Sequence, residues 1–359
     1  MIRPYEFVSA RRWCPPVDGF ARLLAGEEGH WVARAGHDEI VPAADLGGPG
    51  ERRLRLGPAF VAALDDVRVQ VADDSFNVFP MPSLALAETW HDEASHTALA
   101  RRLGAETTLR AGETEVSCRL YDDAPPDLRI EPPALMLASR FAGRDYAHWL
   151  VDLLPRLWAL SLFDRPASVP LLVPGPDLTP WRRETLLALG IANPIIPLAC
   201  RVARIERMFL PSFFAPGGIS RVQVQWIGGR LRRAFGVEGG ARGPRRLLVL
   251  PEGWSPAALD GLRGRGFEPM RPEGMTVAAQ ARLFAAARVV VAPHHPVCAN
   301  LLFARPGTAL IEIAPAGAGD RFHLLAGLGG QRYGRLDEEG LDAGALAAMV
   351  AAACRGEGA

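Results

Sequence analysis

Two histidines, an asparagine and a glutamate lie close together in the C-terminal part of the chain and could form a ligand site. His294 and His295 directly follow a run of β-branched residues that is typical of a strand buried on both faces. Asn300 lies in the helical pattern that follows, and Glu312 lies near the end of a second buried strand. Each residue alone is typical of a turn or a cap. As a set at the carboxyl end of a strand, where open α/β sheets bind ligands, they predict a ligand site.

A second group consists of His148, Asp152 and Arg156, which recur at intervals of four residues. This spacing places them on one face of a helix predicted over Asp145–Phe163. A carboxylate and an imidazole can act together as a general base, one taking the proton and the other orienting it or binding substrate hydroxyls. The alternative, which spacing alone favours, is a polar helix face in water. Pro155 should kink the helix beside Asp152, because it cannot donate to the preceding turn.

Strands and helices alternate twice along the chain, which predicts an α/β protein with parallel sheets. The first alternation is predicted as an N-terminal lobe over residues 129–240, and the second as a C-terminal lobe over residues 241–359. The Gly-rich stretch Gly236–Pro244 is interpreted as the linker between them. Residues 1–128 carry short strand patterns and are predicted to form a β-rich leader, with a helix over Glu93–Leu103.

Local patterns predict the individual elements of the two lobes. Strands are expected at Ala134–Ala138, Val169–Val173, Ile195–Leu198, Arg207–Leu210, Leu247–Leu250, Glu268–Met270, Val289–Val291 and Ala309–Ile313. Helices are expected at Pro180–Leu189, Ser220–Phe235, Pro256–Gly264, Thr276–Ala287, Val297–Ala304, Arg321–Leu328 and Leu341–Cys354.

Composition narrows the class of function. Of the 359 residues, 49% are hydrophobic and 22% are charged, which is typical of a soluble globular protein. The formal net charge of +0 gives no indication of a nucleic-acid partner. All basic residues are arginine, so mechanisms that need a lysine, such as a Schiff base or a Walker-type phosphate loop, are excluded.

The cysteines and the apolar runs bear on the compartment. The five cysteines are scattered and lack CxxC spacing, which argues against a zinc site or a disulfide framework. The N-terminus lacks the apolar core of a signal peptide, and no apolar run approaches the ~20 residues of a membrane span. We therefore expect a cytoplasmic protein without a transmembrane segment; peripheral membrane association through a partner stays open.

The two groups of residues, in this order, resemble motifs of glycosyltransferase family 61. The family's His-Trp-Leu-x-Asp/Glu-x-Leu-Pro-Arg-Leu segment corresponds to His148–Leu157. Its second segment, a strand ending in Gly-Pro-His-Gly-Ala-Gly-Leu-Thr-Asn with Leu-Leu-Phe and Pro-Gly-Thr after it, is matched at Pro293, His294, Asn300, Leu301, Leu302, Phe303, Pro306, Gly307 and Thr308, followed by Glu312. The family includes bacterial capsule and lipopolysaccharide sugar transferases, plant xylosyltransferases and protein O-linked N-acetylglucosaminyltransferases.

The resemblance implies a GT-B-like fold of two Rossmann-like lobes that uses no metal and no cofactor. A nucleotide-sugar donor would bind mainly to the C-terminal lobe, and the sugar would pass with inversion to a glycan or lipid-linked glycan acceptor. On this model His294 and the backbone after it face the phosphates, and Glu312 accepts hydrogen bonds from ribose hydroxyls. Asp152 or His148 deprotonates the acceptor hydroxyl. His295 and Asn300 would also lie at the donor, and Arg156 would contact the acceptor or a phosphate.

One departure from the family pattern leaves alternatives open. His295, Pro296 and Val297 stand where the family has Gly-Ala-Gly. Glycines let a backbone approach a phosphate, and a proline removes an N–H donor. Either His295 compensates as a charged ligand, or the protein is a catalytically silent relative that binds a glycan or a partner enzyme. A hydrolase using His148 and Asp152 is a third alternative, which the lack of a GxSxG nucleophile elbow disfavours.

Overall fold

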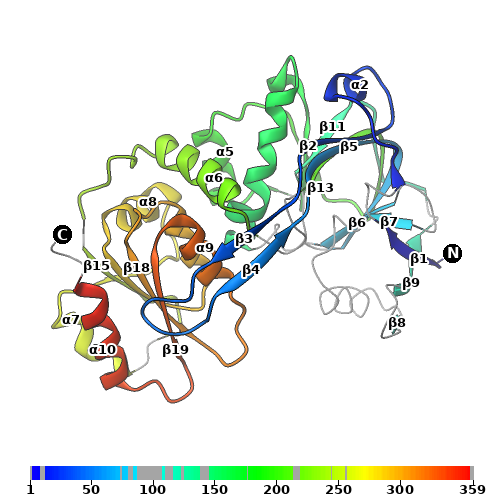
Figure 1. The fold of residues 1–359 in the computed structure, drawn as a ribbon. Helices are drawn as coiled ribbons and strands as arrows, with labels where there is room; N and C mark the ends of the chain where they lie inside the picture. The colour runs from blue at the N-terminus through cyan, green and yellow to red at the C-terminus, as the bar shows by residue number, and fades with distance from the viewer. Residues whose placement is uncertain are drawn as a thin grey trace. The chain divides into compact units, whose positions relative to one another are not determined.

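The computed structural model describes most of the chain, which divides into two compact units (Figure 1). The first unit comprises Met1–His37, Arg55–Thr179 and Ile191–Gly218, and the second comprises Asp38–Leu54, Pro180–Gly190 and Ile219–Ala359. The residues that the structure describes are 2–8, 13–72, 75–79, 84–86, 107–109, 116–122, 125–137, 145–175, 177–212, 219–243, 245–254 and 257–355. The helix predicted over Glu93–Leu103 lies outside these ranges.

The second unit is built on a five-stranded sheet in which every neighbouring pair is parallel. Across the sheet its strands are β16 (Glu268–Met270), β15 (Arg246–Val249), β17 (Val289–Pro293), β18 (Ala309–Ala314) and β19 (Arg332–Asp337). In chain order these are the second, first, third, fourth and fifth strands. The order therefore reverses between β15 and β17, which is the topological switch point where doubly wound sheets bind ligands beyond the carboxyl ends of their strands.

Helices cover the second unit's sheet, and the alternation of side chains decides which face each residue meets. Val291 and Ile311 belong to a core that also contains Val350 of α10 (Ala343–Cys354). Because successive side chains point to opposite faces, Glu312 lies on the other face. Tyr333 contacts that face's helix α9 through the His323 ring, at 5.2 Å between ring centroids. The other helices that follow β15 along the chain are α7 (Asp260–Arg263), α8 (Val277–Ala286), α9 (Arg321–Gly329) and the 3₁₀ helices η5 (Ala257–Leu259) and η6 (Pro296–Leu302).

Most predicted elements of the second unit are confirmed, and one strand was missed. The buried β-branched run at Val289–Val291 forms β17, and Thr276 caps α8 by accepting a hydrogen bond from the backbone N–H of Ala279 (3.2 Å). The stretch predicted as a helix at Val297–Ala304 forms the 3₁₀ helix η6. Strand β19 had no predicted counterpart, because it lies at the sheet's edge and its sequence, RYGRLD, lacks an apolar run.

The first unit contains a mixed eight-stranded sheet and a separate four-stranded sheet. In the larger sheet, β11, β12, β13 and β14 run parallel, whereas β5 pairs antiparallel with β14. Together with the five-stranded parallel sheet, this gives a mixed α/β protein, as the sequence predicts. The larger sheet comprises β13 (Ile195–Leu198), β12 (Leu171–Pro174), β11 (Ala134–Met136), β14 (Val202–Pro211), β5 (Ala59–Ala72) and β2 (Gly29–Arg34), with β10 (Leu128–Ile130) on β14 and β6 (Ser75–Phe79) on β5. The smaller comprises β7 (Leu84–Leu86), β1 (Ile2–Val8), β9 (Val116–Asp122) and β8 (Thr107–Leu109).

Among the described residues, the elements not yet named include a hairpin and three helices. They are α2 (Phe20–Leu24), β3 (His37–Val41), β4 (Arg52–Leu56), α5 (Pro180–Ala188) and α6 (Arg221–Ala234). Strands β3 and β4 pair only with each other among the described strands. Among the described residues, no helix combines the length and the apolar character needed to cross a bilayer.

The boundaries of the two compact units do not coincide with the divisions predicted near residues 128 and 240. Strand β5, from the predicted leader, belongs to the first unit's large sheet because it pairs along its length with β14. Helix α6 and the Gly-rich stretch after it belong to the second unit. The guanidinium of Arg232 on α6 donates to the carbonyl oxygen of Leu302 (2.6 Å), and a Cβ at Gly228 would lie only 3.2 Å from the same oxygen. The assignment of the three segments as functional domains stays a prediction.

The helical segment after Asp145 changes its winding where the sequence predicted a disturbance. Asp145 accepts a hydrogen bond from the backbone N–H of His148 (2.8 Å) and so caps the short helix α4 (Tyr146–His148). A π-helical turn, η2 (Trp149–Leu153), and a 3₁₀ helix, η3 (Leu154–Leu162), follow. Because Pro155 lacks the N–H that a continuous α-helix would need, the regular ladder gives way beside Asp152.

The start of α8 is held by a carboxylate from a distant helix, which gives a stability prediction. Glu184 on α5 accepts hydrogen bonds from the backbone N–H groups of Val277 and Ala278, both at 2.8 Å. These are two of the N–H groups that a helix cannot satisfy internally, and the helix dipole favours an anion there. We expect Glu184→Ala to lower the free energy of unfolding by about 1–2 kcal/mol, measured by denaturant titration. The neighbouring exposed Arg183→Ala is the control, and equal stability of both variants would contradict this role.

Candidate active site

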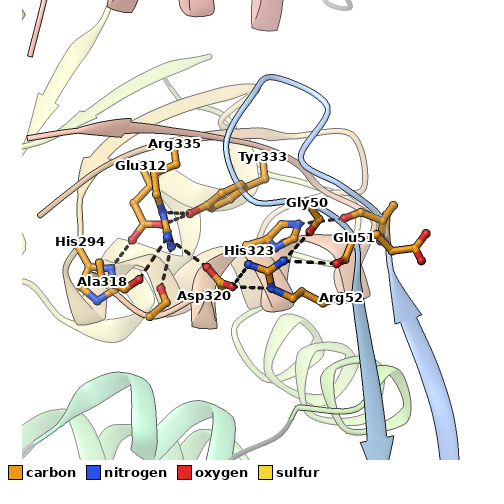
Figure 2. Close-up of polar contacts among 12 residues, drawn as sticks. Gly50, Glu51, Arg52, His294, Glu312, Ala318, Asp320, His323, Tyr333 and Arg335 are labelled. Atoms are coloured by element: carbon orange, nitrogen blue, oxygen red, sulfur yellow. Dashed lines mark hydrogen bonds and ion pairs between the residues drawn. The ribbon is translucent and has the colours of Figure 1, made fainter. Parts of the chain in front are cut away.

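His294 lies immediately beyond the carboxyl end of β17, with its ring against a buried carboxylate of the next strand. Its backbone N–H donates to the carbonyl oxygen of Ile313 (2.8 Å), which fixes the residue beside β18. The imidazole Nδ1 contacts Oε1 of Glu312, as Figure 2 shows. The Glu312 side chain is 0% exposed, whereas 31% of the His294 side chain is exposed. The predicted pair is therefore brought together, at the strand beside the switch point.

Two residues of β19 face the second oxygen of Glu312. The register pairs Glu312 with Arg335 and Leu310 with Tyr333, so both β19 side chains lie on the face of Glu312. The Tyr333 hydroxyl contacts Oε2, and Nη2 of Arg335 lies 3.5 Å from the same atom. Burial and the charge of Glu312 raise the pKa of Tyr333, so its hydroxyl remains protonated and donates to the carboxylate. A buried carboxylate needs such partners to remain ionised.

This arrangement decides which ring nitrogen of His294 is available for chemistry. An ionised carboxylate only accepts hydrogen bonds, so Nδ1 of His294 carries a proton where it meets Glu312. The other nitrogen, Nε2, is then the one that remains for a ligand, in a side chain that is 31% exposed. A neutral imidazole in this tautomer can take a proton at Nε2, and the charged ring can donate to an anionic oxygen.

In the residues after His294, backbone N–H groups form hydrogen bonds within the chain and are not left open to a phosphate. His295 caps η6, because its Nδ1 accepts a hydrogen bond from the backbone N–H of Val297 (3.2 Å). The N–H of Cys298 donates to the carbonyl oxygen of His295 (2.9 Å), and Pro296 has no N–H. Two backbone donors that a glycine loop could offer to a phosphate are thus used within the chain.

Asn300 serves the packing of the helices. It is fully buried, and its amide Nδ2 donates to Oε1 of Gln280 on α8 (2.7 Å). Gln280 in turn lies against the start of α8, where its Nε2 reaches the carbonyl oxygen of Met275 (3.4 Å). This contact of Asn300 connects η6 to α8.

The second predicted group lies in the first unit and is not a water-facing helix surface. Nδ1 of His148 lies 2.5 Å from Oδ2 of Asp152, and the exposed fractions of the two side chains are 16% and 7%. Arg156 is 1% exposed. These values contradict the alternative of a polar face in water. By the same reasoning as for His294, the carboxylate of Asp152 holds Nδ1–H of His148, and Nε2 is the nitrogen that can take a proton.

Comparison with protein-family models gives a match in the segment that contains His294. Residues 256–311 match the model described as Glycosyltransferase 61. The resemblance to glycosyltransferase family 61 is confirmed over this stretch. The part of the chain that matches the family 61 model runs from before η5 into β18 and so contains His294, His295 and Asn300. It ends one residue before Glu312. The match supports glycosyltransferase activity, with a donor and an acceptor as substrates. None of the curated proteins compared with the chain matches it.

Sequence reasoning missed four residues of the contact network around the His294–Glu312 pair. Tyr333 and Arg335 stand two residues apart on an unpredicted edge strand, and their alternation with Gly334 was the only local signal for them. Asp320 and Arg52 form an ion pair (Nη2 to Oδ2, 2.6 Å), although they are far apart in the sequence. Among the described residues, no three His, Cys, Asp or Glu side chains are grouped so that they could hold a metal ion.

Proposed function

We propose that this protein is a metal-independent, inverting glycosyltransferase that moves a sugar from a nucleotide-sugar to a glycan or lipid-linked glycan. The observation that carries this proposal is the family match over the segment that contains His294, whose ring meets Glu312 at the carboxyl end of β17. A GT-B-like pairing of two Rossmann-like lobes, a cytoplasmic location and a role in capsule, lipopolysaccharide or exopolysaccharide synthesis belong to the same proposal.

On the donor side, His294 acts on the diphosphate. Its charged ring donates from Nε2 to a phosphate oxygen and so stabilises the negative charge that develops as the nucleoside diphosphate leaves. Glu312 positions this ring. We assign it this role rather than that of a ribose ligand, because it is 0% exposed and both its oxygens already face His294, Tyr333 and Arg335.

On the acceptor side, His148 is the general base and Asp152 orients it. Nε2 of His148 takes the proton of the acceptor hydroxyl, whose oxygen forms the new bond to the anomeric carbon. The bond from that carbon to the diphosphate oxygen breaks in the same step, so the configuration inverts and the nucleoside diphosphate leaves with the electron pair. The greater burial of Asp152 supports this division of roles, because the more exposed imidazole is the group that an acceptor can reach.

A second candidate function is binding without catalysis. It is favoured by one observation: the His295 ring occupies the cap of η6 and takes the Val297 N–H that a glycine loop would offer to a phosphate. A silent relative of this kind would bind a glycan or a partner enzyme through the same fold.

A panel of UDP- and GDP-sugars tests the proposal. A donor that binds only the folded state must raise the melting temperature, by an amount that grows with its concentration. The active enzyme should also give an acceptor product heavier by one sugar, equally well with and without EDTA. Product formation lost in EDTA and restored by manganese would refute metal independence. A thermal shift without any product would favour the silent relative.

A further inference from the structure

Glu312 depends on two partners that no part of the proposed chemistry touches directly. Its carboxylate has no exposed surface, and an ionised group in such a place is costly unless hydrogen-bond donors surround it. His294 supplies one donor to Oε1, and the Tyr333 hydroxyl supplies another to Oε2. Arg335 adds its positive charge at 3.5 Å from Oε2.

The hydrogen bonds around Tyr333 have a defined direction. Nε–H of Arg335 can only donate, so it donates to the Tyr333 oxygen at 3.0 Å. The tyrosine proton is then directed to Oε2 of Glu312. The Tyr333 hydroxyl and Nη2 of Arg335 both face Oε2 of Glu312 as donors. The carboxylate therefore remains an acceptor toward His294. The tautomer of His294 is thus controlled through Glu312 by residues on the edge strand β19.

Arg335 is itself fixed from its far side, as Figure 2 shows. Its guanidinium donates to the carbonyl oxygens of Gly319 (2.7 Å) and Ala318 (3.3 Å) and to Oδ1 of Asp320 (3.2 Å). The other oxygen of Asp320 accepts from Nε of Arg52 at 2.7 Å. An arginine whose fork is held at so many points cannot rotate away from Tyr333 without breaking several bonds. The chain of contacts runs from β4 through the start of α9 and β19 to His294.

We propose that Tyr333 and Arg335 are positioning residues that hold the carboxylate of Glu312 as the acceptor of Nδ1–H of His294, so that Nε2 faces the donor and the ring can carry a second proton there. The proposal rests on the proposed function for the identity of the ligand. Its structural content, the tautomer of one histidine, can be measured without any sugar. Without the Tyr333 hydroxyl, the buried carboxylate of Glu312 loses a donor to Oε2 and is held less firmly against His294. Nδ1–H of His294 then meets a less firmly held acceptor, so the neutral ring more often carries its proton on Nε2.

Nitrogen NMR of the ¹⁵N-histidine-labelled protein tests this directly. At a pH above the histidine range, we expect wild-type His294, assigned by loss of its signals in His294→Gln, to populate the Nδ1–H tautomer. Tyr333→Phe keeps the ring and its contact with His323, and Arg335→Lys keeps the charge; both should raise the Nε2–H population. Ile311→Val, which trims a buried side chain of the same strand outside this network, is the matched control and should leave the tautomer unchanged.

Kinetics give a second readout that a merely structural role would not produce. We expect Tyr333→Phe to lower kcat/KM for the donor by roughly tenfold, the scale of one hydrogen bond to a charged group, with the acceptor KM unchanged. A His294 that keeps its Nδ1–H tautomer in both folded variants would overturn the proposal. If no protein, wild type included, transfers a sugar, the proposed function fails, and the NMR result still decides whether Tyr333 and Arg335 position His294.

Discussion

Asp152→Asn is expected to lower kcat for sugar transfer by about 10²–10⁴, the usual contribution of a positioned general base. The carboxylate of Asp152 holds Nδ1–H of His148 at 2.5 Å. An asparagine can present its amide N–H to Nδ1 instead, and the imidazole then carries its proton on Nε2, where it cannot accept one from the acceptor hydroxyl. Because Asp152 does not contact the donor in the proposed mechanism, the donor KM should change little.

The neighbouring Asp145 provides the matched control for this variant. Asp145→Asn removes the same charge from the same helical segment, but asparagine caps a helix as well as aspartate does. We therefore expect nearly wild-type kcat and melting temperature for Asp145→Asn. Steady-state kinetics with both substrates varied would separate the two variants. Equal losses in both would show that the charge near the helix start matters, and not the contact between Asp152 and His148.

Glu312→Ala is expected to lower the free energy of unfolding by about 3–5 kcal/mol, the usual scale for breaking a buried charged pair by removing one partner. The substitution leaves the Tyr333 hydroxyl without its acceptor and the largely buried Arg335 without the charge beside it. It also leaves a small void in the face of the sheet that α9 covers. Denaturant titration followed by circular dichroism measures this loss.

An exposed ion pair in the same unit gives the contrast. Glu238 lies 3.3 Å from Arg233, and the exposed fractions of the two side chains are 53% and 78%. Solvent screens such a pair, so Glu238→Gln should change the free energy of unfolding by less than about 1 kcal/mol. If Glu312→Ala proved as mild as Glu238→Gln, the carboxylate of Glu312 would not be the centre of the network described above.

The centre of the second unit could be predicted because local signals there are strong. The β-branched run before His294 and the proline after His295 mark a buried strand and the start of a short helix. The i,i+4 spacing of His148 and Asp152 likewise predicted their contact, although not their burial. In both places the residue that could take part in chemistry lies next to an apolar pattern, and that pattern predicts the strand or helix to which it belongs.

The rest depends on pairing between distant segments. Tyr333 and Arg335 reach Glu312 only through the register of β18 and β19, and an edge strand with mixed polarity carries no pattern that reveals that register. Arg52 meets Asp320 across 268 residues of sequence. The capping role of His295 could not be predicted from the sequence either. A histidine beside a proline does not indicate from which backbone N–H its ring will accept a hydrogen bond.

The central claim is that the second unit binds a nucleoside diphosphate through His294. Isothermal titration of UDP and GDP into the wild type, His294→Ala and His295→Gly tests it most directly. We predict that the wild type binds one of the two nucleotides and that His294→Ala weakens this binding by about 1–3 kcal/mol, the scale of a lost hydrogen bond to a charged group. Weaker binding by His295→Gly would mean that His295 supplies a contact, and stronger binding that it blocks the loop. No binding by any of the three folded proteins would contradict the account.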